Sequence, residues 1–312
     1  MSSITLRKLA GYGAALTLSL YLAVKIIWVT AELIRGTSDW LALNALTVVM
    51  AGVGVTLALA LAQRWGMRLP ALPVVFFAWV GSGFLVPMIP YMAAASLLAP
   101  GGETGDTTPV WETVLLSTGF AGMALGLAVG LPLYLRERWP DAFAGRLGGS
   151  RSPVLACGVL VGVAALAALW LGWALGGTAL TERPLDLNAR LMLGTTGVWA
   201  LAGAWSAWAL GLRRTGLRKW PAVVLGFTVS GMLFAWSAWK LAMALLGPGG
   251  YVPPEYPPVA VAEHAVGVLA GAALFALVLR AARPGVVAYD GRRASRQAGR
   301  RARSRTAGTP GA

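Results

Sequence analysis

The sequence has little that disulfide, metal or nucleotide chemistry could use. It contains one cysteine and one histidine among 312 residues. An internal disulfide is therefore excluded, and a zinc site, which needs several thiolate, imidazole or carboxylate ligands, is not expected. The phosphate-binding pattern GxxxxGK[ST] does not occur, so we expect no ATP site and no other cofactor. Cys157 lies in an apolar run and is interpreted as a small packing residue.

Charge is also scarce. Charged residues make up 12% of the chain and hydrophobic residues 57%, whereas a soluble domain carries about 25% charged residues. The apolar residues come in blocks of roughly 20, which is the length of a helix that crosses a bilayer core. A transmembrane β-barrel would alternate apolar and polar positions instead. In lipid, a continuous apolar block satisfies its backbone only as a helix, so the sequence predicts an all-α, polytopic membrane helical bundle.

Eight such blocks are found, and we expect each of them to span the membrane. Residues 71–98 contain Pro73, Pro87 and Pro90, which predicts a kinked or broken helix there. The first block contains Lys25 and lacks a small-residue cleavage site, so it is interpreted as a span and not as a signal peptide. The blocks cover residues 9–31, 41–62, 71–98, 110–135, 154–176, 191–212, 221–246 and 259–281.

Basic residues alternate between successive loops, which predicts the orientation of the bundle. The loops after the second, fourth and sixth blocks are basic, whereas the opposite loops hold most of the acidic residues. We expect a multi-pass protein of the cytoplasmic membrane. By the positive-inside rule, both of its termini are expected to lie in the cytoplasm. The basic residues of the inner loops are Arg64, Arg68, Arg136, Arg138, Arg146, Arg151, Arg213, Arg214, Arg218 and Lys219.

Residues 282–312 form an arginine-rich tail with too little apolar content to fold, so we expect a disordered cytoplasmic segment. Such a tail can adhere to the anionic lipids of the inner leaflet, or it can be a solvated segment that only fixes the topology. The formal net charge of the chain is +14. Because the arginines lie mainly in short loops and in the tail, we expect the bilayer, and no nucleic acid, as the partner.

The two halves of the chain resemble each other. The stretch SGFLVPMIPYMAAASLLAPGG from Ser82 aligns without a gap with SGMLFAWSAWKLAMALLGPGG from Ser230, at an offset of 148 positions. We therefore predict two parallel four-helix repeats, related by an axis along the membrane normal. By analogy with transporters, a binding site is expected where two such halves meet. The predicted repeats cover residues 1–148 and 149–281.

Ionisable side chains inside the predicted helices are the candidate binding residues. Charge in the hydrocarbon region is costly, so each such group needs a partner or a role. By their distance from the helix ends, the acids and bases lie at similar depth in the outer third of the membrane, which suggests ion pairs. A site for an ion or a proton, a purely structural ion pair, and lysines that reach to the interface all stay open. We identify no catalytic or metal-binding residue; the candidates are Lys25, Glu112, Lys240, Glu263 and His264.

The composition, rich in Ala, Gly, Arg and Trp, resembles that of uncharacterised multi-pass membrane proteins of high-GC actinobacteria. The resemblance covers the whole chain and implies residence in the cytoplasmic membrane but no activity. The duplicated bundle favours a permease or ion-coupled transporter with a site at the repeat interface near the outer leaflet. The alternatives are a non-catalytic membrane partner (a sensor, an immunity factor or a subunit of an oligomer or larger complex) and a membrane-embedded enzyme acting on an apolar substrate.

Overall fold

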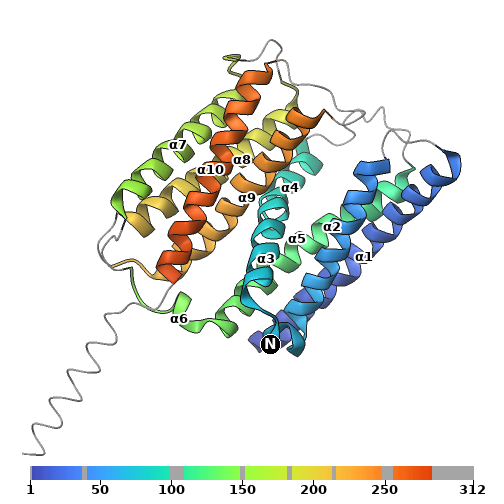
Figure 1. Ribbon diagram of the computed structural model, residues 1–312, viewed down its shortest axis with the longest axis horizontal. Helices are drawn as coiled ribbons and strands as arrows, with labels where there is room; N and C mark the ends of the chain where they lie inside the picture. The colour runs from blue at the N-terminus through green and yellow to red at the C-terminus, as the bar shows by residue number, and fades with distance from the viewer. Residues whose placement is uncertain are drawn as a thin grey trace, which may run out of the picture.

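Helices make up nearly all of the chain that the structure describes. The computed structural model describes residues 2–36, 41–98, 109–147, 152–180, 185–212, 216–247 and 256–282. Within these ranges the only strand-type pairing is one isolated bridge between Arg146 and Arg218. The long helices run side by side, and the N-terminus lies at the same end of the bundle as the short helix α6 (Figure 1). The predicted all-α membrane bundle is confirmed.

All eight predicted blocks are helical within the described residues, the third as two consecutive helices. Seven segments, with α3 and α4 counted as one, are long and apolar enough to cross a membrane. Helix α8 is not among these seven, although it has 25 residues and packs along α7 and α9. The elements are α1 (Ser3–Arg35), α2 (Leu41–Ala62), the 3-10 helix η1 (Arg64–Arg68), α3 (Ala71–Leu85), α4 (Met88–Leu98), α5 (Val110–Arg138), α6 (Pro140–Phe143), α7 (Pro153–Ala174), α8 (Leu187–Gly211), α9 (Lys219–Leu246) and α10 (Pro257–Ala282).

The outer surface of the bundle is apolar, as a lipid-facing surface must be. Leu72 is 82% exposed and Leu269 is 70% exposed, and many other large apolar side chains are uncovered. A soluble monomer rarely leaves so much apolar surface in contact with water. The exposed side chains and the apolar helices together define a multi-pass membrane protein.

The third predicted span is broken, as its prolines indicate. Helix α3 ends at Leu85 and α4 begins at Met88, with Pro87 between them. Proline has no backbone N–H, and its ring clashes with the preceding turn of a helix. Across the break, the Ile89 N–H donates to the Val86 carbonyl at 3.2 Å, a tighter turn than that of an α-helix. Beyond the break, α4 packs on α8 of the second half of the chain.

The two halves, α1–α5 and α7–α10, pack their helices differently. In the first half α1 packs extensively on both α2 and α5, whereas in the second half the main pairs are α7 with α8 and α9 with α10. Glycines allow close approach in both halves. A Cβ atom built at Gly126 of α5 would lie 2.4 Å from the Cβ of Ala14 on α1. One built at Gly267 of α10 would lie 2.1 Å from the Ser237 hydroxyl on α9.

The halves are joined where α3 crosses α9. Gly83 and Gly231, which are equivalent in the sequence alignment, lie against each other at this crossing. A Cβ atom at Gly83 would be 2.0 Å from the carbonyl carbon of Gly231. Next to them, the Trp79 indole N–H donates to the Ser230 hydroxyl at 2.8 Å, and the Trp79 ring stacks on Phe234 at 4.7 Å between centroids. We call this contact the α3–α9 crossing.

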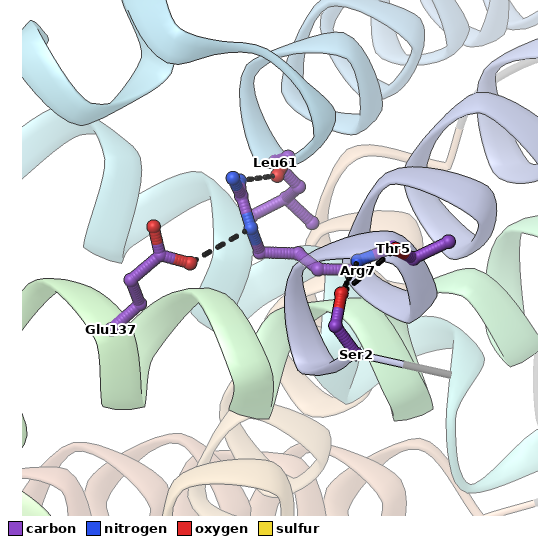
Figure 2. A network of polar contacts seen from close by, with 5 residues as sticks. All are labelled: Ser2, Thr5, Arg7, Leu61 and Glu137. Carbon is purple, nitrogen blue, oxygen red and sulfur yellow. Dashed lines mark hydrogen bonds and ion pairs between the residues drawn. The ribbon is translucent and has the colours of Figure 1, made fainter.

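At the N-terminal end of the bundle, Arg7 connects three helices. Its side chain is buried, and Nη1 donates to the carbonyl oxygen of Leu61 in the last turn of α2, where carbonyls lack helical donors (Figure 2). Its Nε lies 3.1 Å from Oε2 of Glu137 on α5. Ser2 caps α1 just before it, because the Ser2 hydroxyl accepts from the Thr5 N–H at 3.2 Å. Arg7 therefore holds the ends of α2 and α5 against α1.

Arg7→Ala is expected to lower the free energy of unfolding by about 2 kcal/mol, because a buried carbonyl and a carboxylate lose a charged donor. The measurement is reversible unfolding of the purified full chain in mixed micelles. Arg136→Ala is the matched control, since Arg136 is an exposed arginine on α5, and it should change the stability by less than about 0.5 kcal/mol. Equal losses in the two variants would contradict the role given to Arg7.

Candidate functional site

Three of the five candidate residues line one cavity. Lys240 of α9 and Glu263 and His264 of α10 contribute to its wall, whereas Lys25 and Glu112 do not. The cavity has a volume of about 210 Å³ and is also lined by residues of α4, α7 and α8. Most of its wall is apolar or aromatic. The larger side chains of this kind are Met88, Met192, Met232, Trp170 and Trp236.

Glu263 is held by a hydrogen bond from a tryptophan. The indole N–H of Trp170, on α7, donates to Glu263 Oε1 at 2.7 Å. The glycines of α10 that follow Glu263 on the same side pack on α9, so the carboxylate is turned toward the interior of the bundle. The neighbouring His264 is 8% exposed, and its Nδ1 lies 3.8 Å from the same carboxylate oxygen. Within the described residues, that buried nitrogen has no hydrogen-bond partner.

Lys240 brings a positive charge to the same cavity. It lies near the C-terminal end of α9 and lines the same cavity as Glu263 and His264. Among the described residues, however, it forms no salt bridge or hydrogen bond with either of them, nor with any other side chain. The direct Lys–Glu ion pair that matched depth suggested is therefore absent from this part of the chain. The ammonium group is left next to a carboxylate that a tryptophan already binds.

The other two candidates belong to a separate polar cluster in the first half. Lys25 Nζ donates to Asn44 Oδ1 at 3.1 Å and lies 4.0 Å from the centre of the Trp28 ring. Trp28 in turn donates to Glu112 Oε2 at 2.8 Å. The Asn44 amide donates to Glu32 Oε1 at 2.9 Å. Among the described residues, Oε2 of Glu32 is buried without a hydrogen bond, but the lysine of this cluster is bound, unlike Lys240.

Both halves therefore use the same kind of contact. A tryptophan on the first helix of each half donates to a glutamate near the start of the last helix, in the pairs Trp28–Glu112 and Trp170–Glu263. Sequence reasoning identified both acids but assigned lysines as their partners. The sequence did contain a signal for the tryptophan donors. An indole N–H inside an apolar segment needs an acceptor when it is buried.

The chemistry open to the cavity is the binding of a small solute. Within the described ranges, no group of three or more His, Cys, Asp or Glu side chains is placed to hold a metal ion. The ionisable groups are one ammonium, one hydrogen-bonded carboxylate and one imidazole, in a wall whose other residues are mainly apolar or aromatic. Such a space fits a molecule with an apolar body and a single polar group.

Comparison with protein-family models, with curated proteins and with solved structures finds no match to the chain. The helical bundle and its apolar surface define the class, a multi-pass membrane protein. Any more specific function has to be inferred from the cavity and its charges.

Proposed function

We propose that the chain is a permease-like or ion-coupled transporter-like bundle that takes a small solute into the cavity beside Lys240, Glu263 and His264. The observation that carries the proposal is the cavity of about 210 Å³ with three ionisable side chains in its wall. Ionisable groups within membrane-spanning helices are costly, and they commonly mark a pathway or a ligand site. Transporters often build such sites from interrupted helices. Here α4, which follows the break at Pro87, contributes Met88 to the wall.

The proposed site lies mainly in the second half of the chain. Helices α7, α8, α9 and α10 supply all of its lining except Met88, which comes from the first half. The site is therefore placed beside the junction of the halves and not on an axis between them. Lys240 is six residues before the end of α9 at Leu246, or roughly 9 Å along the helix. The site therefore approaches one membrane face at Lys240 and extends toward the middle of α9 at Met232.

The proposal includes an origin of the two halves, residues 1–148 and 149–281, by duplication of a four-helix unit. Two pairs of contacts support it. The Ser82 hydroxyl donates to the Trp79 carbonyl at 3.1 Å, and the equivalent Ser230 donates to the Phe227 carbonyl at 2.9 Å. The Trp–Glu contact recurs in the same way. In this view the polar cluster of the second half came to line a cavity, while the lysine and the acids of the first-half cluster are bound to Asn44 and Trp28.

We also propose that the protein resides in the cell membrane with both termini in the cytoplasm. The distribution of described basic residues supports this orientation, since the N-terminal end of the bundle carries most of them. Residues 283–312, the predicted lipid-binding tail, lie outside the described residues, and inner-leaflet binding stays a prediction. The basic residues at the N-terminal end are Arg7, Lys8, Arg64, Arg68, Arg136, Arg138, Arg146, Arg218, Lys219 and Arg280.

Flux through proteoliposomes tests the proposed function. Benzenesulfonate and phenyltrimethylammonium are suitable radiolabelled probes, because each is permanently charged and crosses protein-free bilayers slowly. We expect the protein to accelerate uptake of one of them, and Ala189→Trp, which fills the cavity from α8, to abolish the effect. Leu201→Trp is the control, since Leu201 is on the same helix and is 49% exposed on the outer surface. Uptake of both probes at the rate of protein-free liposomes, or uptake that Ala189→Trp leaves intact, contradicts transport through this cavity.

One observation favours a second function, a membrane-embedded enzyme. Glu263 presents a carboxylate to a mainly apolar space, and a carboxyl group in such surroundings can act as a general acid. The two functions differ in a direct readout. A transporter releases its solute unchanged, whereas an enzyme returns a product that mass spectrometry of the proteoliposome lumen would detect.

A further inference from the structure

The charges around the cavity also indicate the chemical class of its ligand. Resting on the proposed function of the cavity as a solute site, we infer that the ligand is a small, mainly apolar monoanion whose acidic group pairs with the Lys240 ammonium. Three features support this class of ligand: the hydrogen bonds of each charged group, the volume of the cavity and the contrast with the first half of the chain.

The carboxylate is already bound, whereas the ammonium is not. Glu263 accepts the Trp170 indole N–H at 2.7 Å, so a cationic ligand would have to compete with that donor. Lys240 has no hydrogen bond or salt bridge among the described residues. His264 adds a second polar group, since its buried Nδ1 has no partner within the described ranges. A ring nitrogen of an imidazole can donate to an oxygen of the ligand, and an anion with two or more oxygens can reach both residues.

The space limits the ligand to roughly one ring with a substituent. A cavity of about 150 Å³ lined by apolar side chains admits benzene. The present cavity, at about 210 Å³, leaves room for a ring plus a small acidic group. Trp170 and Trp236 supply flat aromatic surfaces, and the three methionines supply polarisable contacts that adapt to different ring shapes. A monoanion of about ten non-hydrogen atoms fits this wall.

The first half of the chain lacks the equivalent cation. Met92 occupies the position that corresponds to Lys240 at the offset of 148 residues. The lysine of the first half, Lys25, donates to Asn44 and lies over the Trp28 ring. Apart from the exposed Lys8 at the N-terminal end of the bundle, the described lysine of the first half is thus bound, whereas Lys240 in the second half is not. We therefore expect one anion site for each chain, although the two halves share the Trp–Glu contact.

Binding of three probes of equal shape and different charge tests the inference. Benzenesulfonate is an anion, benzenesulfonamide is neutral and phenyltrimethylammonium is a cation. Each is titrated into the full chain in nanodiscs, with calorimetry and with the fluorescence of the tryptophans as readouts. We expect benzenesulfonate to bind about 10-fold or more tightly than benzenesulfonamide, because a charge-assisted contact adds to the same apolar burial. Equal affinities, or tighter binding of the cation, overturn the inference without any variant.

A pair of lysine variants locates the effect. Lys240→Met should lose the preference of about 10-fold for the anion and should leave the affinity for benzenesulfonamide nearly unchanged. Lys25→Met makes the same change in the closed cluster of the first half, so it should leave all three affinities unchanged. Circular dichroism checks that both variants are folded. If Lys240→Met keeps the anion preference, the anion binds elsewhere and the inference is overturned. The same holds if Lys25→Met removes the preference equally.

The outcomes separate this inference from the proposed function. Binding of benzenesulfonate at Lys240 without flux contradicts transport and supports the anion site. Binding and flux of phenyltrimethylammonium without binding of benzenesulfonate support transport and overturn the anion site.

Discussion

Replacing Gly83 by alanine is expected to force α3 away from α9 and to cost about 3 kcal/mol or more of unfolding free energy. A Cβ atom at this position would lie 2.0 Å from the carbonyl carbon of Gly231 and 2.4 Å from its oxygen. Both are backbone atoms, so no rotamer change can relieve the clash. Gly231→Ala should have a similar effect, because its Cβ would lie 2.3 Å from the carbonyl oxygen of Trp79. Reversible unfolding in mixed micelles measures both losses.

Gly81→Ala is the matched control for these two variants. Gly81 lies on the same helix two residues before Gly83, and the nearest atoms to its added Cβ would be side-chain carbons of Leu127 and Leu57 at 3.7 and 3.9 Å. Those are ordinary van der Waals distances, so the stability should change little or rise slightly with the better helix propensity of alanine. A loss at Gly81 equal to that at Gly83 would show that the loss comes from helix flexibility and not from the α3–α9 crossing.

The same variants should also displace two side chains of the cavity wall. Met232 follows Gly231 directly and lines the cavity, and Met88 lies just after the end of α3. Both side chains are therefore positioned by the α3–α9 crossing. The double variant, Gly83→Ala with Gly231→Ala, should cost less than the sum of the single losses, because both changes open one shared contact.

The sequence predicted the helices well because bilayer thickness sets the length of an apolar segment. The second block, 41–62, coincides with α2 (Leu41–Ala62). The prolines of the third block predicted its break, but only Pro87 falls there. Pro73 and Pro90 lie in the first turns of α3 and α4, where the missing N–H removes no helical hydrogen bond. The block 191–212 was also predicted as a span, yet α8 is less apolar than the seven segments that are long and apolar enough to cross a membrane.

The candidate site was predicted less completely, because a sequence gives the depth of a residue in the membrane but not its lateral position. Lys25 and Lys240 were expected at similar depth with the two glutamates. The structure places Lys25 with Asn44 in the first half and Lys240 at a cavity in the second half. Which helices are neighbours is decided by packing, and glycine and tryptophan contacts far apart in the sequence determine it here. Apolar segments carry too few distinctive residues for those pairings to be read from the chain.

Glu263→Ala is expected to have the second large effect, a loss of about 3 kcal/mol in unfolding free energy. The change removes the acceptor of the Trp170 indole and the carboxylate that lines the same cavity as Lys240. Lys240→Ala should cost less, because it removes an attraction to Glu263 but no direct hydrogen bond. The double variant should cost less than the sum of the two, with a coupling of about 1 kcal/mol, since each single change leaves the other charge uncompensated.

A second double variant shows whether that coupling is specific. Glu112 accepts a tryptophan in the same way as Glu263, but it belongs to the closed cluster of the first half and does not line the cavity. Lys240→Ala combined with Glu112→Ala should therefore give additive losses. Additive losses for Lys240 with Glu263 as well would mean that the two charges do not act on each other, and the cavity would then contain an ammonium group that the protein itself does not stabilise. Non-additivity confined to the Glu263 pair would instead show that Lys240 and Glu263 stabilise each other within the cavity wall.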